Sequence, residues 1–228
     1  MTIVKICGIT TLEDAQVAIE AGADLLGFVF YPKSPRYIEV ERAREIVKAI
    51  RNPQSAIRSS SRFVGLFVNE SVERIQTILT EAQLDYAQLH GDESPELLKQ
   101  LGERAFRAIR PVDYEDGLAQ AKQFYRSGTA SPSSAQPVEA CPRLLVDAYD
   151  AKAYGGTGKK ADWHAAAEIA RHYPNLLLAG GLSVENIAEA IRTVRPWGVD
   201  VSSGVEAAPG RKDPQKIQKF IQLAKEVK

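Results

Sequence analysis

The amino-acid sequence predicts an α/β protein that forms one (β/α)8 TIM barrel, a single domain over residues 1–228. Eight short apolar runs alternate with longer amphipathic stretches, and eight βα units is the number that closes such a barrel. The runs are continuously apolar, as in parallel strands that are covered on both faces. An open, doubly wound sheet is the alternative, because local patterns do not reveal closure.

The expected strands recur along the whole chain. They cover residues 3–6, 25–30, 63–68, 86–89, 105–109, 144–146, 176–179 and 199–201. Helices are expected between them, and four begin at residues whose side-chain oxygens can cap a first turn: Thr11, Ser94, Ser183 and Asp213. Proline follows Ser94 and Asp213, where its missing amide proton costs nothing.

Two polar, serine-rich segments, 52–62 and 126–142, interrupt the alternation of expected strands and helices. Each lies between a helix and the next strand, which in a barrel is the N-terminal face, opposite to the chemistry. Both are interpreted as tolerated insertions, and Cys141 in the second one as a thiol without a role.

The composition excludes several classes of protein. With 29 basic and 29 acidic residues, no overall field attracts nucleic acid or an anionic membrane. No apolar run approaches the ~20 residues of a membrane span, and the N-terminus lacks the pattern of a secretory signal. A cytoplasmic protein is expected, with Cys7 and Cys141 as free thiols. It is expected to be a monomer, because no helix shows an apolar outer face.

Polar residues follow six of the expected strands at their carboxyl ends, where barrel enzymes place their chemistry. Cys7 ends the first strand, and Lys5 points to the same side two residues earlier. A thiol in this place can act as a base or nucleophile, and the Lys5 ammonium would favour the thiolate. The alternative is a buried cysteine that serves as a small apolar residue.

Asp147 follows the apolar run 144–146 and is a candidate general acid. A carboxyl group with a pKa of about 3.9 is ionised at pH 7, so an anionic substrate would have to raise that pKa in the complex. Arg36 lies in a loop with two prolines, and its planar guanidinium suits a carboxylate ligand. His90 is either a substrate contact or a core histidine bonded to backbone.

Small residues follow the seventh and eighth strands, where barrels form their phosphate site. Gly180, Gly181, Ser202, Ser203 and Gly204 would let backbone amides approach an anion. Isolated glycines also mark turns, but their occurrence in both of these loops favours a phosphate ligand.

The run 155–160, Gly-Gly-Thr-Gly-Lys-Lys, lacks the glycine and hydroxyl positions of a Walker A loop. The run fits a dinucleotide-binding fingerprint only loosely, so an NAD enzyme is disfavoured. We expect instead a loop over the active site that brings Gly156 to the substrate. No group of His, Cys, Asp or Glu has the spacing of metal ligands, and no metal site is predicted.

Seven segments occur in one order along nearly the whole chain: 5–10 (KICGIT), 27–30 (GFVF), 34–36 (SPR), 88–91 (QLHG), 155–158 (GGTG), 179–182 (AGGL) and 198–206 (GVDVSSGVE). In this order they resemble the phosphoribosylanthranilate isomerase family. Each segment alone is a weak signal, and all of them in order are specific.

The resemblance implies an aldose–ketose isomerase, an intramolecular oxidoreductase of tryptophan biosynthesis that needs no cofactor. It would convert N-(5-phosphoribosyl)anthranilate to 1-(2-carboxyphenylamino)-1-deoxyribulose 5-phosphate by an Amadori rearrangement. By resemblance, Asp147 protonates the ring oxygen, Cys7 removes the C2 proton as general base, and Arg36 binds the anthranilate carboxylate. The glycine and serine loops would hold the phosphate of this small-molecule phosphosugar, with support from Asp200.

Two alternatives stay open. A dual-substrate isomerase would also convert the histidine-pathway aminoaldose, although such enzymes resemble one another in carrying aspartate where this chain has Cys7. A phosphate-binding barrel without activity would use the same loops, but the presence of both Cys7 and Asp147 argues against it.

Overall fold

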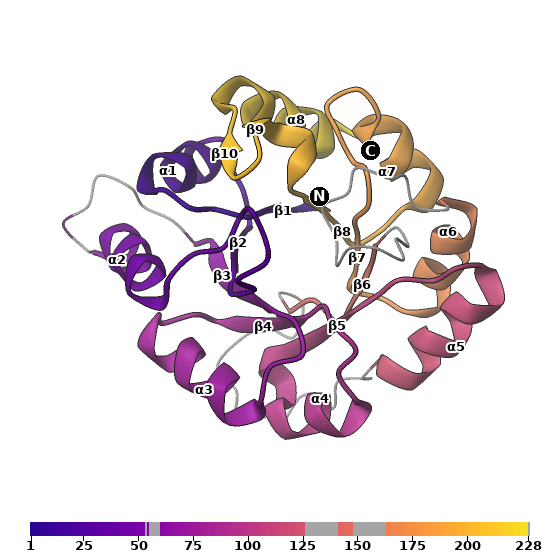
Figure 1. Ribbon diagram of the computed structural model, residues 1–228. Helices are drawn as coiled ribbons and strands as arrows, with labels where there is room; N and C mark the ends of the chain where they lie inside the picture. Colours follow the sequence, from indigo (N-terminus) through magenta and orange to yellow (C-terminus); the bar gives the residue numbers. More distant parts are fainter. Residues whose placement is uncertain (53, 55–59, 126–140, 148–162, 228) are drawn as a thin grey trace.

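The computed structural model is a closed barrel of eight parallel strands surrounded by helices (Figure 1). It describes residues 1–52, 54, 60–125, 141–147 and 163–227. Strands β1 to β8 pair in chain order, and β8 pairs with β1 to close the ring. The predicted barrel is confirmed, and the open sheet is excluded. Within the described residues, no helix has both the length and the apolar character to cross a membrane.

Each barrel strand begins and ends within one residue of the predicted bounds. The strands are β1 (Ile3–Cys7), β2 (Leu25–Val29), β3 (Arg62–Phe67), β4 (Tyr86–Leu89), β5 (Ala105–Ile109), β6 (Leu144–Val146), β7 (Leu176–Leu178) and β8 (Gly198–Val201), followed by the short strands β9 (Glu206–Ala208) and β10 (Arg211–Lys212). The helices are α1 (Leu12–Glu20), α2 (Val40–Arg51), α3 (Val72–Glu81), α4 (Pro95–Leu101), α5 (Tyr114–Phe124), α6 (Trp163–His172), α7 (Ile187–Val194) and α8 (Pro214–Glu226).

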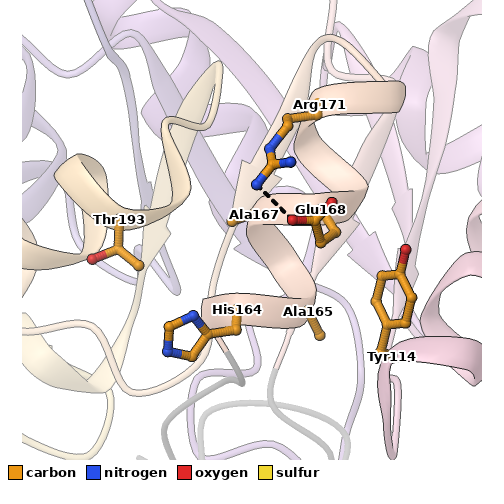
Figure 2. A pocket seen from close by; sticks show the side chains of 7 residues that line it. All are labelled: Tyr114, His164, Ala165, Ala167, Glu168, Arg171 and Thr193. Carbon is orange, nitrogen blue, oxygen red and sulfur yellow. Dashed lines mark ion pairs between the residues drawn. The ribbon is translucent and has the colours of Figure 1, made fainter.

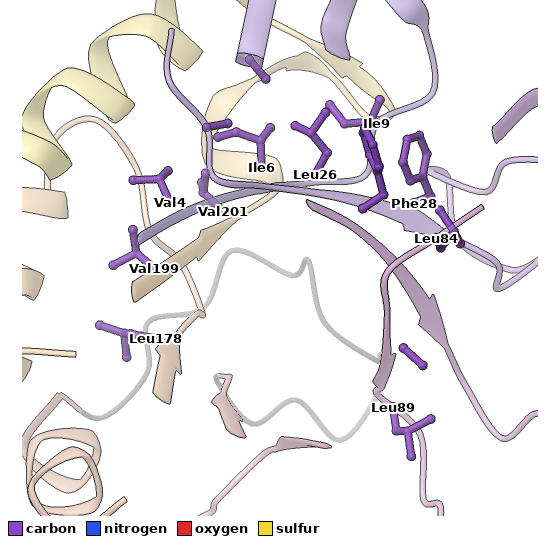
Figure 3. Packing of buried hydrophobic residues seen from close by; sticks show 14 of the residues in the cluster. Val4, Ile6, Ile9, Leu26, Phe28, Leu84, Leu89, Leu178, Val199 and Val201 are labelled. Carbon is purple, nitrogen blue, oxygen red and sulfur yellow. The ribbon is translucent and has the colours of Figure 1, made fainter. Parts of the chain in front are cut away.

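Apolar side chains fill both sides of the strands. The larger cluster lies between the strands and the helices, and Figure 3 shows Val4, Leu26 and Phe28 among its members. A second cluster fills the inside of the barrel and includes Leu25 and Val64. Leu25 and Leu26 belong to different clusters because neighbouring side chains of a strand point to opposite faces. The continuous apolar runs in the sequence follow from this double burial.

Three of the four predicted helix caps are confirmed. Thr11, Ser94 and Asp213 precede α1, α4 and α8, and each side chain accepts a hydrogen bond from an amide of the first turn. The prediction for Ser183 is wrong, since α7 begins only after Asn186. The Asn186 side chain accepts a hydrogen bond from the Ser183 amide at 2.9 Å, so these residues form a turn ahead of the helix.

A hairpin of β9 and β10 follows β8, and the strand pattern did not predict it. Its turn contains Pro209 and Gly210, a dipeptide that is typical of turns. Gly210 has a φ of 78°, and a Cβ atom there would lie 2.5 Å from the Pro35 carbonyl oxygen. Thr10 Oγ1 donates to the Gly210 carbonyl oxygen at 2.9 Å. The hairpin is therefore fastened to the loops after β1 and β2.

The predicted insertions lie mostly outside the described residues. Cys141, near the end of the second one, packs against the cluster inside the barrel. Its Sγ lies 3.4 Å from the Glu103 carbonyl oxygen. Burial raises the pKa of Cys141 to about 11, so the thiol keeps its proton at neutral pH.

Candidate active site

Six polar side chains occupy the barrel at the carboxyl ends of its strands, and none of them is more than 8% exposed. They are Lys5, Cys7, Gln88, His90, Asp147 and Asp200. Strand alternation turns them inward: Lys5 and Cys7 follow Ile3, which packs on the inner cluster, and Asp147 follows Leu145 of that cluster. The predicted rim of polar groups therefore exists, and it lies above an apolar barrel floor.

Two glycines, Gly8 and Gly27, leave room for the side chains that surround the end of β1. Cys7 pairs with Gly27 of β2, and a Cβ atom at Gly27 would lie 2.8 Å from Cys7 Sγ. A Cβ atom at Gly8 would lie 2.7 Å from Arg36 Cδ and 3.1 Å from Ser202 Oγ. The strand end that carries the thiol thus also supports the Arg36 side chain and the loop after β8.

Lys5 lies beside Cys7 as expected, but it also forms an ion pair with Asp200. Lys5 Nζ donates to Asp200 Oδ1 at 3.0 Å. Although burial opposes the charge of Lys5, the Asp200 carboxylate holds the lysine pKa above its ordinary value. Burial raises the pKa of Cys7, and the attraction of Lys5 offsets this only in part. Lys5 favours the thiolate, yet the resting form of Cys7 at neutral pH is the thiol.

We expect the Cys7 thiolate to form only above the pH range of an ordinary thiol, and at still higher pH in a Lys5→Met variant. Removing Lys5 takes away an attraction and leaves Asp200 to repel the thiolate. The folded chain holds this proton more tightly than the unfolded chain, so stability declines as pH rises from the ordinary thiol pKa through that of Cys7. Ultraviolet absorbance of the thiolate, in a Cys141→Ala background, measures the titration. Ionisation of Cys7 at or below the ordinary thiol range would contradict this account.

Asp147 lies against His90, and Gln88 fixes the histidine ring from its other side. His90 Nε2 is 3.2 Å from Asp147 Oδ2. Gln88 Nε2 donates to His90 Nδ1 at 2.8 Å. With Nδ1 as acceptor, the neutral ring carries its proton on Nε2, toward Asp147. The His90 ring is bonded through Nδ1 to the Gln88 side chain rather than to backbone, and its Nε2 faces Asp147 without a hydrogen bond among the described residues.

Arg36 forms two parallel hydrogen bonds with Glu206, the first residue of β9. Its Nε lies 2.7 Å from Glu206 Oε1, and its Nη2 lies 2.8 Å from Oε2. Lys212 of β10 reaches the same carboxylate, with Nζ 3.0 Å from Oε1. Sequence reasoning missed Glu206 and Lys212, although the turn at Pro209 and Gly210 signals that the residues before and after it pair.

The loop after β7 has a backbone that glycine allows. Gly180 and Gly181 have φ values of 88° and 64°, which side chains disfavour. Asn186 Nδ2 donates to the Gly181 carbonyl oxygen at 2.8 Å and holds the turn from the start of α7. The prediction that these glycines contact phosphate stays a prediction.

The loop after β8 lies directly against the loop after β7. A Cβ atom at Gly204 would collide with the Leu182 carbonyl oxygen, so only glycine permits this approach. Ser202 precedes a short 3-10 turn, η3 (Ser203–Val205). The Ser202 hydroxyl is buried, and no partner for it lies among the described residues. An oxygen-rich anion at these loops would satisfy this hydroxyl.

Other predicted features lie elsewhere. Gly156 and the rest of 155–160 fall outside the described residues. In the described part of the chain, no three His, Cys, Asp or Glu side chains are grouped to hold a metal ion.

A hollow of about 470 Å³ opens on the outer helical wall, between α5, α6 and α7 (Figure 2). It is lined by Tyr114, His164, Ala165, Ala167, Glu168, Arg171 and Thr193. None of these residues belongs to the predicted site. Glu168 and Arg171 pair with each other there, one helical turn apart on α6.

Comparison with known proteins shows matches along the whole chain. The family model described as N-(5'phosphoribosyl)anthranilate (PRA) isomerase matches residues 4–223. N-(5'-phosphoribosyl)anthranilate isomerase of Geotalea uraniireducens is 45% identical and covers 99% of both chains. The solved structure of phosphoribosyl anthranilate isomerase from Thermotoga maritima has a TM-score of 0.81 at 39% identity, over 99% of both chains. A structure of such an isomerase with reduced 1-(o-carboxyphenylamino)-1-deoxyribulose 5-phosphate has a TM-score of 0.78, at 39% identity over 99% of both chains.

Proposed function

Because the chain belongs to the N-(5'-phosphoribosyl)anthranilate isomerase family, we propose that Cys7 is its catalytic base and Asp147 its catalytic acid. The chain isomerises phosphoribosylanthranilate in tryptophan biosynthesis. One observation supports the two roles above all: both side chains point into the barrel at the carboxyl ends of strands, β1 and β6, above an apolar barrel floor.

The proposed reaction begins with Asp147 in its protonated form. Asp147 gives its proton to the ring oxygen, the bond from that oxygen to C1 breaks, and the nitrogen lone pair forms a Schiff base at C1. The Cys7 thiolate removes the proton from C2, and the electron pair moves into the C1–C2 bond to give an enolamine. A proton then adds to C1 while the C2 hydroxyl loses one, which gives the ketose. C1 is reduced and C2 is oxidised, so the reaction is an intramolecular oxidation and reduction.

Burial of Cys7 affects both the strength and the amount of this base. A thiolate with a raised pKa is a stronger base once formed, but fewer thiols are ionised at neutral pH. The proposed mechanism therefore requires that Cys7 lose its proton, and Asp147 hold one, while the substrate is bound.

The remaining predicted residues are proposed to hold the substrate. Arg36 binds the anthranilate carboxylate, and the contacting loops after β7 and β8 hold the phosphate through their amides and the Ser202 hydroxyl. His90 and Gly156 contact the substrate, and Asp200 supports the site through Lys5.

Cys7 also disfavours the dual-substrate alternative, since the resemblance places aspartate at this position in such enzymes. We further propose a cytoplasmic location for the single-domain chain, because its phosphorylated substrate does not cross membranes freely. The described surface exposes three large apolar side chains, Met1, Val112 and Tyr114, which favours a monomer. The balance of 29 basic and 29 acidic residues favours no nucleic-acid or membrane partner.

We expect an Arg36→Met variant to bind the reduced product analogue about tenfold or more weakly, because the carboxylate loses a charge-assisted hydrogen bond. Its affinity for the matching phenylamino compound without the carboxylate is expected to stay nearly unchanged. Isothermal titration calorimetry with both ligands measures the difference, and wild-type turnover of phosphoribosylanthranilate is the reference. An equal loss for the two ligands would show that Arg36 does not bind the carboxylate.

A further inference from the structure

Two buried charged side chains lie behind Arg36, the proposed carboxylate ligand, and neither has a role in the mechanism above. Arg36, Glu206 and Lys212, which we call the charge cluster, alternate in sign as positive, negative and positive. The Glu206 side chain is 5% exposed and the Lys212 side chain 0%. Burying such groups is costly, and buried ion pairs contribute little net stability.

Glu206 engages one edge of the Arg36 guanidinium. Four of the five N–H donors of a guanidinium lie along two edges that each match a carboxylate. Glu206 accepts from Nε and Nη2, the side edge. Among the described residues no hydrogen bond from Nη1 is formed, so the end edge, with Nη1 and the second proton of Nη2, is available to another carboxylate. The bond to Glu206 fixes the plane of the guanidinium and the direction of that edge.

Lys212 sets the charge of the cluster. A pair of Arg36 and Glu206 alone would be neutral and would attract an incoming carboxylate only weakly. Burial lowers the pKa of Lys212, and the attraction of the Glu206 carboxylate opposes this effect. With Lys212 protonated, the charge cluster has a net charge of +1. The hydrogen bonds from Arg36 and Lys212 outweigh burial and hold the pKa of Glu206 below its ordinary value, so this residue stays anionic.

Lys212 also connects the cluster with the other end of the substrate site. Its Nζ donates to the Ser202 carbonyl oxygen at 3.1 Å. Ser202 begins the loop proposed to hold the phosphate, and its Oγ would lie 3.1 Å from a Cβ atom at Gly8, against which Arg36 also packs. One buried ammonium group therefore touches the partner of the carboxylate ligand and the backbone of the phosphate loop.

We propose that Glu206 and Lys212 are positioning residues that make the site selective for a carboxylate-bearing substrate. Glu206 fixes the orientation of the Arg36 guanidinium, so that its end edge faces the substrate carboxylate, and Lys212 keeps the charge cluster positive. The inference rests on the proposed role of Arg36. It deepens that role by assigning the selectivity to two residues of the β9–β10 hairpin, which do not touch the substrate.

The test compares the affinities of the reduced product analogue and its phenylamino counterpart without the carboxylate, by calorimetry on the full chain. Binding of these unreactive ligands avoids any effect of the variants on Cys7. We expect Lys212→Met to lower the preference for the carboxylate about tenfold or more, the size of one charge-assisted hydrogen bond. We expect the double variant Glu206→Gln with Lys212→Met to regain part of that preference, because Arg36 alone is again positive.

A merely structural role makes the opposite prediction for the double variant. If the two residues were only structural, the loss of both would lower the affinities for the two ligands equally, at least as much as in Lys212→Met. The preference for the carboxylate would then not be regained, and that result would overturn the proposal. Lys225→Met is the matched control: Lys225 Nζ pairs with Asp24 at 3.2 Å at the other end of α8, and its loss is expected to leave the preference unchanged.

Two further variants separate the possible failures. If Arg36→Met keeps the preference, the proposed role of Arg36 is wrong; if only Arg36→Met loses it, the role stands and the present inference is wrong. Circular dichroism checks folding. Should Lys212→Met not fold, Lys212→Gln retains a donor for Ser202 but no charge, and it is expected to lose the preference in the same way.

Discussion

A Cys7→Ala variant is expected to turn over phosphoribosylanthranilate with a kcat lowered by about 10² or more, the usual contribution of a general base. Alanine removes the Sγ atom and leaves a small side chain in the space beside Gly27, so the barrel end should keep its shape. The decrease of anthranilate fluorescence measures the rate. Because Cys7 acts after binding in the proposed mechanism, the affinity for the reduced product analogue is expected to change little.

The second cysteine provides the matched control. Cys141 lies between α5 and β6, and its thiol is protonated at neutral pH because burial raises its pKa to about 11. A Cys141→Ala variant is therefore expected to keep the wild-type kcat. If Cys7→Ala is nearly as active as Cys141→Ala, the family assignment stands but another group removes the C2 proton.

The strands of the barrel were predictable because burial on both faces requires a continuous run of apolar residues in the sequence. Each strand packs on the helices with one face and on the barrel interior with the other, so even a three-residue strand such as β7 reads as an apolar run. The start of α7 was not predictable from Ser183. Its hydroxyl has the chemistry of a cap, but the Asn186 side chain takes up the Ser183 amide and shifts the first helical turn along the chain.

The positions of the proposed acid, the proposed base and the two small-residue loops could be inferred from strand ends alone, since position along a strand fixes the side to which a residue points. Their partners could not. Lys5 was expected to activate Cys7, but the register of β1 and β8 places Asp200 beside the same ammonium. Glu206, which also binds Lys212, meets Arg36 only because a hairpin folds back onto a loop from the other end of the chain. Such long-range pairings are decided by the closed ring, which no local pattern contains.

An Asp147→Asn variant is expected to lose about 10² or more in kcat, because an amide cannot donate the proton that opens the ribose ring. The substitution keeps the shape of the side chain. The amide oxygen of the variant side chain can take the place of the carboxylate oxygen of Asp147, which lies 3.2 Å from His90 Nε2. Gln88 continues to hold the ring of His90 through Nδ1, so the position of the residue should survive while its acidity is lost.

Ligands with and without a closed ring separate acid catalysis from binding in this variant. The reduced product analogue is an open chain and has no ring oxygen to protonate, so we expect Asp147→Asn to bind it within a few-fold of the wild type. Stopped-flow measurement of anthranilate fluorescence follows the closed-ring substrate in the same variant. A large loss of affinity for the open-chain analogue, with kcat largely retained, would make Asp147 a binding residue and leave the ring-opening proton to another donor. A loss in kcat alone identifies it as the acid, because the open-chain analogue already lacks the bond between C1 and the ring oxygen that the acid cleaves.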